Sequence, residues 1–139
     1  LGYPHPQAER TMFLNQHHAL GNNRSPKQCI SADQLQLIRQ AVEQVHASDN
    51  LLDYLQRLVA YTRQSHEFAV GLSPRGALAL LDSAKTWAVM NSRGHVVPED
   101  LQMVLPSVAA HRLVPSGDYA GDNQALVAIL QHNVDVVGP

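Results

Sequence analysis

The chain has 139 residues, a length that fits one compact domain or a smaller domain with tails. Apolar residues make up 45% and charged residues 16%, a balance that is typical of a folded globular protein and excludes a highly charged disordered chain. The formal net charge of -2 gives no one-sided positive field of the kind that binds phosphate backbones, so nucleic acid is not an expected partner.

Apolar spacing predicts helices in almost the whole chain, because no segment sustains the alternation of period two that marks a half-buried strand. A first helix is expected from about Pro6 to Leu20, since proline suits a first helical position and Gly21 suits the residue after the end. Residues 21–26 are rich in turn formers and predict a loop.

A capping box predicts the start of a second helix. Ser31 and Gln34 have the spacing at which a serine and a glutamine side chain satisfy each other's backbone N–H groups. The apolar residues that follow recur at spacings of three and four, which predicts a buried stripe on a helix that ends near His46. That stripe comprises Leu35, Ile38, Val42 and Val45.

Serine caps also predict the third and fourth helices. Ser48 or Asp49 is expected to cap the third, and Ser73 followed by Pro74 predicts the N-cap and first position of the long fourth. Residues 91–94 are expected to end the fourth helix, because Asn and Gly tolerate a left-handed backbone. The predicted buried faces are Leu51, Leu55, Leu58 and Thr62, widened by Leu52 and Val59, in the third helix and Ala77, Leu78, Leu81, Ala84 and Ala88 in the fourth.

The fifth helix is predicted to start at Pro98-Glu99-Asp100, where acidic side chains meet the positive end of the helix dipole. Turn formers in residues 115–123 then precede a short terminal helix. The predicted stripes are Leu101, Val104, Leu105 and Val108 in the fifth helix and Leu126, Ile129 and Leu130 in the last. Short connections between these helices predict an all-α fold, a small bundle of about five or six helices.

The sequence lacks the motifs of several enzyme classes. It has no phosphate-binding loop G-x-x-x-x-G-K-[ST], no apolar strand ending in paired acidic residues for magnesium, and no G-x-S-x-G nucleophile turn. Its eight histidines show no metal-ligand spacing, so we expect no metal site. Tyr54, Tyr61 and Trp87 lie in helical patterns without a basic stripe, which argues against stacking on bases.

Compartment is indicated only weakly by the residues. The single cysteine, Cys29, cannot form an internal disulfide, which fits a reducing compartment, and we expect a cytoplasmic protein. No apolar run approaches the roughly 20 residues that a membrane-spanning helix needs, because a polar or charged residue interrupts each candidate. We therefore expect no membrane span.

An arginine in the first turn of a capped helix is the most informative local feature. Arg75 follows Ser73 and Pro74, where the helix dipole is already positive. An anion bound there would meet both the free backbone N–H groups and the guanidinium. The ordinary alternative, which physical reasoning alone favours, is an exposed arginine that contacts Glu67, Asp100 or solvent.

The segment Gly71 to Ala88, with Gly71-Leu72-Ser73-Pro74-Arg75 at its start, resembles the sensor 2 helix of MoxR-type AAA+ ATPases. Gly2-Tyr3-Pro4 resembles that family's exit from the core ATPase domain into the lid. Ser48 to Arg63 resembles its middle lid helices, and Arg93 to Leu101 with His111-Arg112-Leu113 resembles its closing segment. The resemblance therefore implies an AAA+ lid.

The resemblance covers residues 1–113 and fades beyond them, so we assign 1–113 to the lid and 114–139 to a C-terminal extension with a short helix. Val97 departs from the threonine often found in the family before Pro-Glu-Asp. The departure removes a cap side chain worth about 1 kcal/mol but leaves the fold intact.

In this family the sensor 2 arginine approaches the γ-phosphate of ATP, and the resemblance implies that role for Arg75, in its own subunit or in a neighbour's. Ser73 and Pro74 would lie near the same nucleotide, Tyr3 at the hinge and Arg112 at a neighbouring subunit. A packed aromatic ring and a surface salt bridge are the ordinary alternatives for the last two.

ATP and Mg²⁺ would be held by the core AAA+ domain of the parent protein, so this chain alone is not expected to hydrolyse ATP. The resemblance further implies a hexameric, chaperone-like ATPase that activates partner proteins, often of the von Willebrand A type. Two alternatives stay open: a freestanding helical adaptor with a groove lined by Leu, Val and Trp87, and, more distantly, a small enzyme of another kind.

Overall fold

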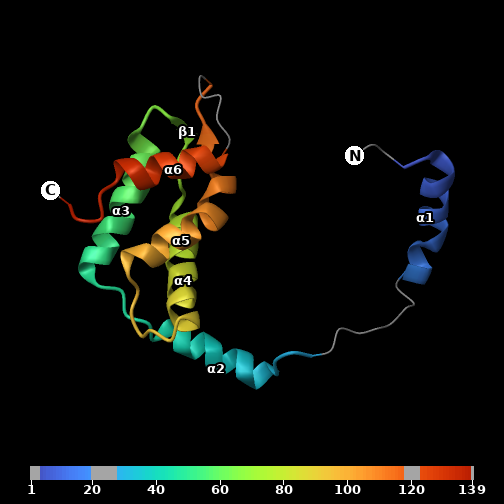
Figure 1. Cartoon of the computed structure of the whole chain (residues 1–139), viewed down its shortest axis with the longest axis horizontal. Helices are drawn as coiled ribbons and strands as arrows, with labels where there is room; N and C mark the ends of the chain where they lie inside the picture. Colours follow the sequence, from blue (N-terminus) through green and yellow to red (C-terminus); the bar gives the residue numbers. More distant parts are fainter. Residues whose placement is uncertain (1–3, 20–27, 118–122, 139) are drawn as a thin grey trace. The chain divides into compact units, whose positions relative to one another are not determined.

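The computed structural model describes residues 4–19, 28–117 and 123–138. In that part of the chain the elements are α1 (Pro6–Ala19), α2 (Ala32–Glu43), α3 (Asp49–Gln64), β1 (Phe68–Val70), α4 (Pro74–Met90), α5 (Pro98–Ala109), the 3-10 helix η1 (Ala110–Arg112), β2 (Val114–Pro115) and α6 (Asn123–Asn133). Helices dominate (Figure 1), which confirms the predicted helical bundle. The chain divides into two units, Leu1–Gln34 and Leu35–Pro139.

The first unit contains α1 and the beginning of α2. The helix α1 begins at Pro6 as predicted, and Met12, Phe13 and Leu14 on it are exposed. The loop predicted for residues 21–26 lies outside the described residues.

The helix α2 has the predicted cap but not the predicted burial. The N–H of Ser31 donates to Oε1 of Gln34 at 2.8 Å, and the N–H of Gln34 donates to Oγ of Ser31 at 3.1 Å. No residue of α2 is buried: Leu35 and Ile38 are 38% and 43% exposed, and the buried Val45 lies after the helix end. The stripe prediction was wrong for α2, because an apolar period identifies the face that can pack but not the surface that covers it.

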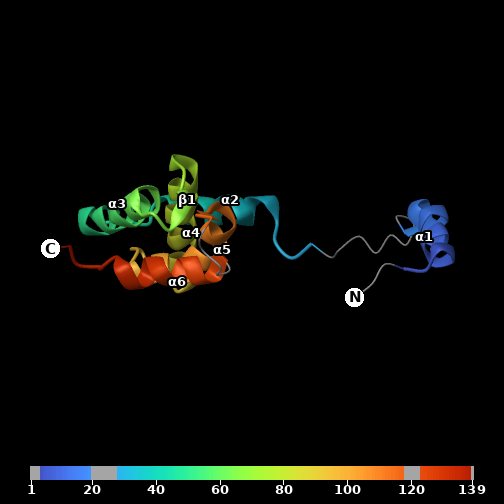
Figure 2. The same cartoon turned by 90° about the horizontal axis from the view of Figure 1, so that it is seen from above.

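The core of the second unit lies among α3, α4, α5 and α6 (Figures 1 and 2). The helix α3 starts after Ser48, whose Oγ accepts the N–H of Leu51 at 3.3 Å, and its predicted face, including Thr62, is buried apart from the half-buried Leu52. In α4 one predicted core position was wrong, because Leu78 is 62% exposed whereas Leu80 is fully buried. The largest fully buried side chains include Tyr54, Leu58, Leu80, Leu101, Leu105, Leu113, Leu126 and Leu130.

The helix predicted after Leu113 is present as α6. Its residues Leu126, Val127 and Leu130 are buried in the same core as α3, α4 and α5. The boundary drawn at Leu113 follows the sequence resemblance, whereas packing joins α6 to the helices that precede it. Removing the segment after Leu113 would therefore expose apolar surface of the bundle.

A short antiparallel pair of strands joins the α3–α4 connection to the segment after η1. Phe68 lies opposite Pro115, and Val70 lies opposite Val114, with an irregularity between the two pairs. Sequence reasoning predicted no strand here, because strands of three and two residues are too short to show a period of two.

The helix α4 ends at Met90, directly before the stop predicted at residues 91–94, but the left-handed residue is not of the predicted type. The N–H of Arg93 donates to the carbonyl of Ala88 and the N–H of Ser92 to that of Val89, both at 2.9 Å, which is the bonding of a Schellman motif. Ser92 has the positive φ of 56°, and no described glycine has a positive φ. The left-handed position thus falls on a serine rather than on Asn or Gly.

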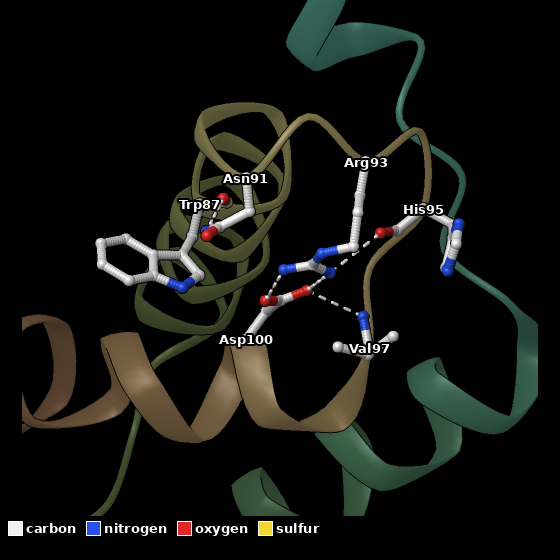
Figure 3. Close-up of polar contacts among 6 residues, drawn as sticks. All are labelled: Trp87, Asn91, Arg93, His95, Val97 and Asp100. Atoms are coloured by element: carbon white, nitrogen blue, oxygen red, sulfur yellow. Dashed lines mark hydrogen bonds and ion pairs between the residues drawn. The ribbon is translucent and has the colours of Figure 1, made fainter.

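The loop from α4 to α5 is fastened by one buried carboxylate. Asp100, which is 2% exposed, accepts hydrogen bonds from two guanidinium nitrogens of Arg93 at 2.6 and 2.5 Å and from the N–H of Val97 at 2.9 Å (Figure 3). The bond from Val97 is one half of a capping box, in which the side chain of Asp100 accepts the backbone N–H of the N-cap residue. The other half is absent, because a valine side chain, unlike that of threonine, has no oxygen that could accept an N–H of the first turn. We call Arg93 and Asp100 the loop clasp.

The loop clasp predicts a pH dependence of stability. Burial disfavours the charge of Asp100, but the bonds from Arg93 and Val97 outweigh it and hold the pKa of this carboxyl below its ordinary value of 3.8. Because the folded pKa is the lower one, the contribution is complete well above pH 3.8 and is lost as pH falls through the folded pKa. Urea unfolding between pH 6 and pH 3 should show the stability gap between the native chain and Asp100→Asn narrowing at acid pH, and a constant gap would contradict the assignment.

Candidate functional site

The candidate site begins at the first turn of α4, which has the predicted cap. Oγ of Ser73 accepts the N–H of Gly76 at 3.2 Å, and Pro74 occupies the first helical turn, where a missing N–H costs nothing. Arg75 follows within the same turn. The local sequence therefore fixes the position of Arg75 in the first turn of α4.

The loop before this turn packs tightly against the last turns of α3. A Cβ atom on Gly71 would lie 2.4 Å from the carbonyl oxygen of Thr62, so only glycine allows the two backbones to approach this closely. The N–H of Leu72 donates to Oγ1 of Thr62 at 2.9 Å, and the carbonyl of Leu72 accepts from Nε of Arg63 at 3.0 Å. The start of α4 is thus fastened to α3.

A second close approach lies on the other side of the same turn. A Cβ atom on Gly76 would lie 2.7 Å from Cδ1 of Leu72 and 3.4 Å from Cδ of Arg112. Glycine here makes room for the buried Leu72 and brings the aliphatic stem of Arg112 beside the first turn of α4. The guanidinium of Arg112 donates to the carbonyl of Val108 and contacts Nε2 of His111, and no salt bridge to it is present among the described residues.

Arg75 itself is exposed, and no hydrogen bond or ion pair ties it to the described part of the chain. The two carboxylates considered as its partners are engaged elsewhere. Asp100 binds Arg93, and Glu67 accepts from Tyr61 and Ser65, each at 2.9 Å. Burial, and then the hydrogen bond to Glu67, raises the pKa of the Tyr61 hydroxyl above 10.0. Of the ordinary alternatives for Arg75, contact with solvent is the one observed.

An apolar groove of about 660 Å³ runs between α3 and α4 beside this site. Its lining includes Leu52, Val59 and Leu81, with Arg63 and Pro74 at the end nearest Arg75. Trp87, which the adaptor hypothesis placed in such a groove, is not among the lining residues. Pro74 belongs both to the lining of the groove and to the turn that carries Arg75.

Other kinds of site are not found in the described residues. No group of three or more His, Cys, Asp or Glu side chains in residues 4–19, 28–117 and 123–138 could hold a metal ion. Within the same residues, no helix combines the length and apolar character that crossing a membrane requires. Tyr3, the candidate hinge residue, lies outside the described residues.

The helices of the second unit define this chain as a lid domain of the AAA type. A family model for the AAA lid domain matches residues 60–132, which extend from α3 to α6. Because the match covers more than half of the chain, the chain belongs to the AAA lid domain family, and its similarity to MoxR proteins makes it a MoxR-type lid.

Three curated relatives are similar to this chain in sequence. Chaperone MoxR1 of Mycobacterium tuberculosis is 30% identical over 132 residues, which cover 88% of this chain and 34% of that protein. Protein YeaC of Bacillus subtilis is 31% identical over 94 residues, covering 66% and 29%. Protein MoxR of Paracoccus denitrificans is 40% identical over 60 residues, covering 43% and 18%. The chain thus spans about a third or less of the length of each relative.

A solved structure shows the same fold. A crystal structure of a candidate ATPase from Cytophaga hutchinsonii superposes with a TM-score of 0.72 at 21% identity. The superposition covers 100% of this chain and 45% of the other. At this identity the likeness concerns the fold alone.

Proposed function

We propose that this lid presents Arg75 to the γ-phosphate of ATP bound to a core AAA+ domain that lies outside the chain. The observation that carries the proposal is the state of Arg75, which is exposed at a helix N-terminus while the neighbouring carboxylates bind other residues. A guanidinium in that place meets phosphate charge at the positive end of the helix dipole. It would stabilise the charge that develops during phosphoryl transfer.

Ser73 and Pro74 support the proposal as the residues that build this turn. Both would lie beside the same nucleotide, although the cap and the first helical position already account for their presence. The chain has no phosphate-binding loop, so ATP and Mg²⁺ would be held by the core domain and the chain alone would not hydrolyse ATP. The lid would transmit the state of the nucleotide to the rest of the protein.

The partners follow from the same proposal. They are the core AAA+ domain of the same protein, neighbouring subunits of a cytoplasmic homo-oligomeric ring of six, and a client such as a von Willebrand A-type protein. Chaperone-like assembly or activation of that client is supported by the relative described as chaperone MoxR1. The groove between α3 and α4 supports docking of another protein surface next to the lid, which is also what the adaptor hypothesis required.

The test is ATP hydrolysis by the complete ATPase that contains this lid. Replacing Arg75 with alanine is expected to lower turnover about tenfold, which corresponds to roughly 1.4 kcal/mol of transition-state stabilisation, while the ring stays intact. The exposed Arg39 on α2 provides a matched control, because Arg39→Ala removes the same charge beside Asp82 and Lys85, away from the first turn of α4. Steady-state turnover, nucleotide affinity and ring size are measured together. Unchanged turnover and affinity in Arg75→Ala would show that Arg75 is a surface arginine.

A further inference from the structure

Two consecutive residues of α3 hold the backbone of the residue that leads into the candidate site. Oγ1 of Thr62 accepts the N–H of Leu72 at 2.9 Å, and Nε of Arg63 donates to the carbonyl of Leu72 at 3.0 Å. Leu72 is 2% exposed, so its backbone groups have little access to water. Both of them are therefore satisfied by side chains of another helix, ten and nine positions earlier in the chain.

Thr62 is fixed in the orientation that this contact needs. Its hydroxyl donates to the carbonyl of Val59 at 2.8 Å, and a hydroxyl has only one hydrogen to donate. The oxygen can therefore serve Leu72 only as an acceptor. Since Thr62 is 2% exposed, no water competes for it, and the close approach of Gly71 to the Thr62 carbonyl sets the spacing between the two segments.

Arg63 contributes differently, because its side chain is exposed and only Nε is bonded among the described atoms of its guanidinium. It also lines the groove together with Pro74. Its hydrogen bond satisfies the backbone carbonyl of Leu72, while the charge of the guanidinium stays exposed to solvent. Thr62 and Arg63 thus hold Leu72 in place through hydrogen bonds to its N–H and to its carbonyl.

We propose that Thr62 and Arg63 are positioning residues for Arg75. They fix Leu72, the residue before the Ser73 cap, and so set where the first turn of α4 begins relative to α3 and where the guanidinium of Arg75 stands. The inference rests on the proposed function of Arg75. A displacement of about 1 Å in a group that stabilises a transition state can cost up to roughly a hundredfold in rate. Loss of the hydrogen bonds to Leu72 should therefore lower the turnover of the ATPase.

The experiment is a double-mutant cycle in the complete ATPase, with turnover and KM measured for Thr62→Val, Arg75→Ala and their combination. Thr62→Val keeps the shape of the side chain and removes the hydroxyl, and Thr62→Ser is the matched control that restores it. We expect Thr62→Val to lower kcat about threefold with little change in KM, and Thr62→Ser to recover most of the loss. In the Arg75→Ala background the same substitution should lower kcat hardly further, because the group that it positions is gone.

Each outcome decides the matter. Equal losses of kcat with and without Arg75 would mean that Thr62 acts through stability alone, and would overturn the inference while the function of Arg75 stands. An Arg75→Ala protein with native turnover would overturn the proposed function and, with it, the inference. Arg63→Ala provides a second route if Thr62→Val fails to fold, because Arg63 is exposed. It should show the same loss of kcat, and the same disappearance of that loss without Arg75.

Discussion

Replacing Gly71 with alanine is expected to cost the chain about 3 kcal/mol in free energy of unfolding, at the upper end of what overpacking usually costs. The new Cβ would lie 2.4 Å from the carbonyl oxygen and 2.7 Å from the carbonyl carbon of Thr62. Both atoms belong to the backbone of α3, so neither can rotate away as a flexible side chain would. The loop must shift, and the bonds from Leu72 to Thr62 and Arg63 must lengthen with it.

Urea unfolding of the 139-residue chain measures this cost, and Gly94→Ala is the matched control. A Cβ on Gly94 would have no heavy atom within 4 Å, and Gly94 does not have a positive φ. Its replacement is expected to change stability by less than about 1 kcal/mol, with a gain possible because alanine restricts the unfolded chain. Equal unfolding midpoints for the two alanine variants would contradict the close approach at Gly71.

Local signals were the part of this fold that the sequence predicted well. The capping box at Ser31 and Gln34 and the caps at Ser48 and Ser73 each join residues three positions apart. Both partners of each bond can therefore be recognised within one short stretch of sequence. The first turn of α4, with Arg75 in it, was predictable for the same reason. The nucleotide role of Arg75 stays a prediction that rests on the resemblance and on its exposure.

Longer-range features were not predictable in the same way. The exposed faces of α2 and of Leu78 depend on which surfaces surround them, and a periodic pattern contains no information about that. Asp100 was considered as a partner for Arg75, but it binds Arg93, seven residues away through a loop whose path sequence reasoning does not give. The hydrogen bond between Thr62 and Leu72 did leave one signal in the sequence. A hydroxyl in an otherwise apolar buried stripe must have hydrogen-bond partners, and Thr62 was placed in such a stripe.

Replacing Arg93 with methionine is expected to destabilise the chain, because it leaves the buried carboxylate of Asp100 without its counter-charge. Asp100 would keep only the N–H of Val97 as a described partner. The loss should stay below that for a fully buried pair, since the Arg93 side chain is 29% exposed and water can partly replace it. Thermal and urea unfolding at neutral pH, where Asp100 is charged, measure the loss.

A second substitution distinguishes the lost charge pair from lost packing. In Arg93→Met/Asp100→Asn the buried charge is gone, while the asparagine carbonyl can still accept the N–H of Val97. The double variant is therefore expected to be more stable than Arg93→Met alone, because an unpaired buried charge costs more than a neutral amide. If the two substitutions destabilise additively, the loop clasp is not an interacting pair.

Hydrogen exchange would test which segment the loop clasp holds in place. The N–H of His46 donates to the carbonyl of Gly94 at 3.0 Å, and the N–H of Val96 donates to the carbonyl of His46 at 2.9 Å. The α4–α5 loop is thus hydrogen-bonded to the segment that leads from α2 into α3. The helix α3 in turn contains Thr62, which accepts the N–H of Leu72 just before α4. Release of the loop in Arg93→Met should speed exchange at His46 and Val96 more than at Leu130 in the core of α6. Equal acceleration at all three amides would mean global unfolding, and only a selective change at His46 and Val96 supports a loop clasp that orders the connection between α2 and α3.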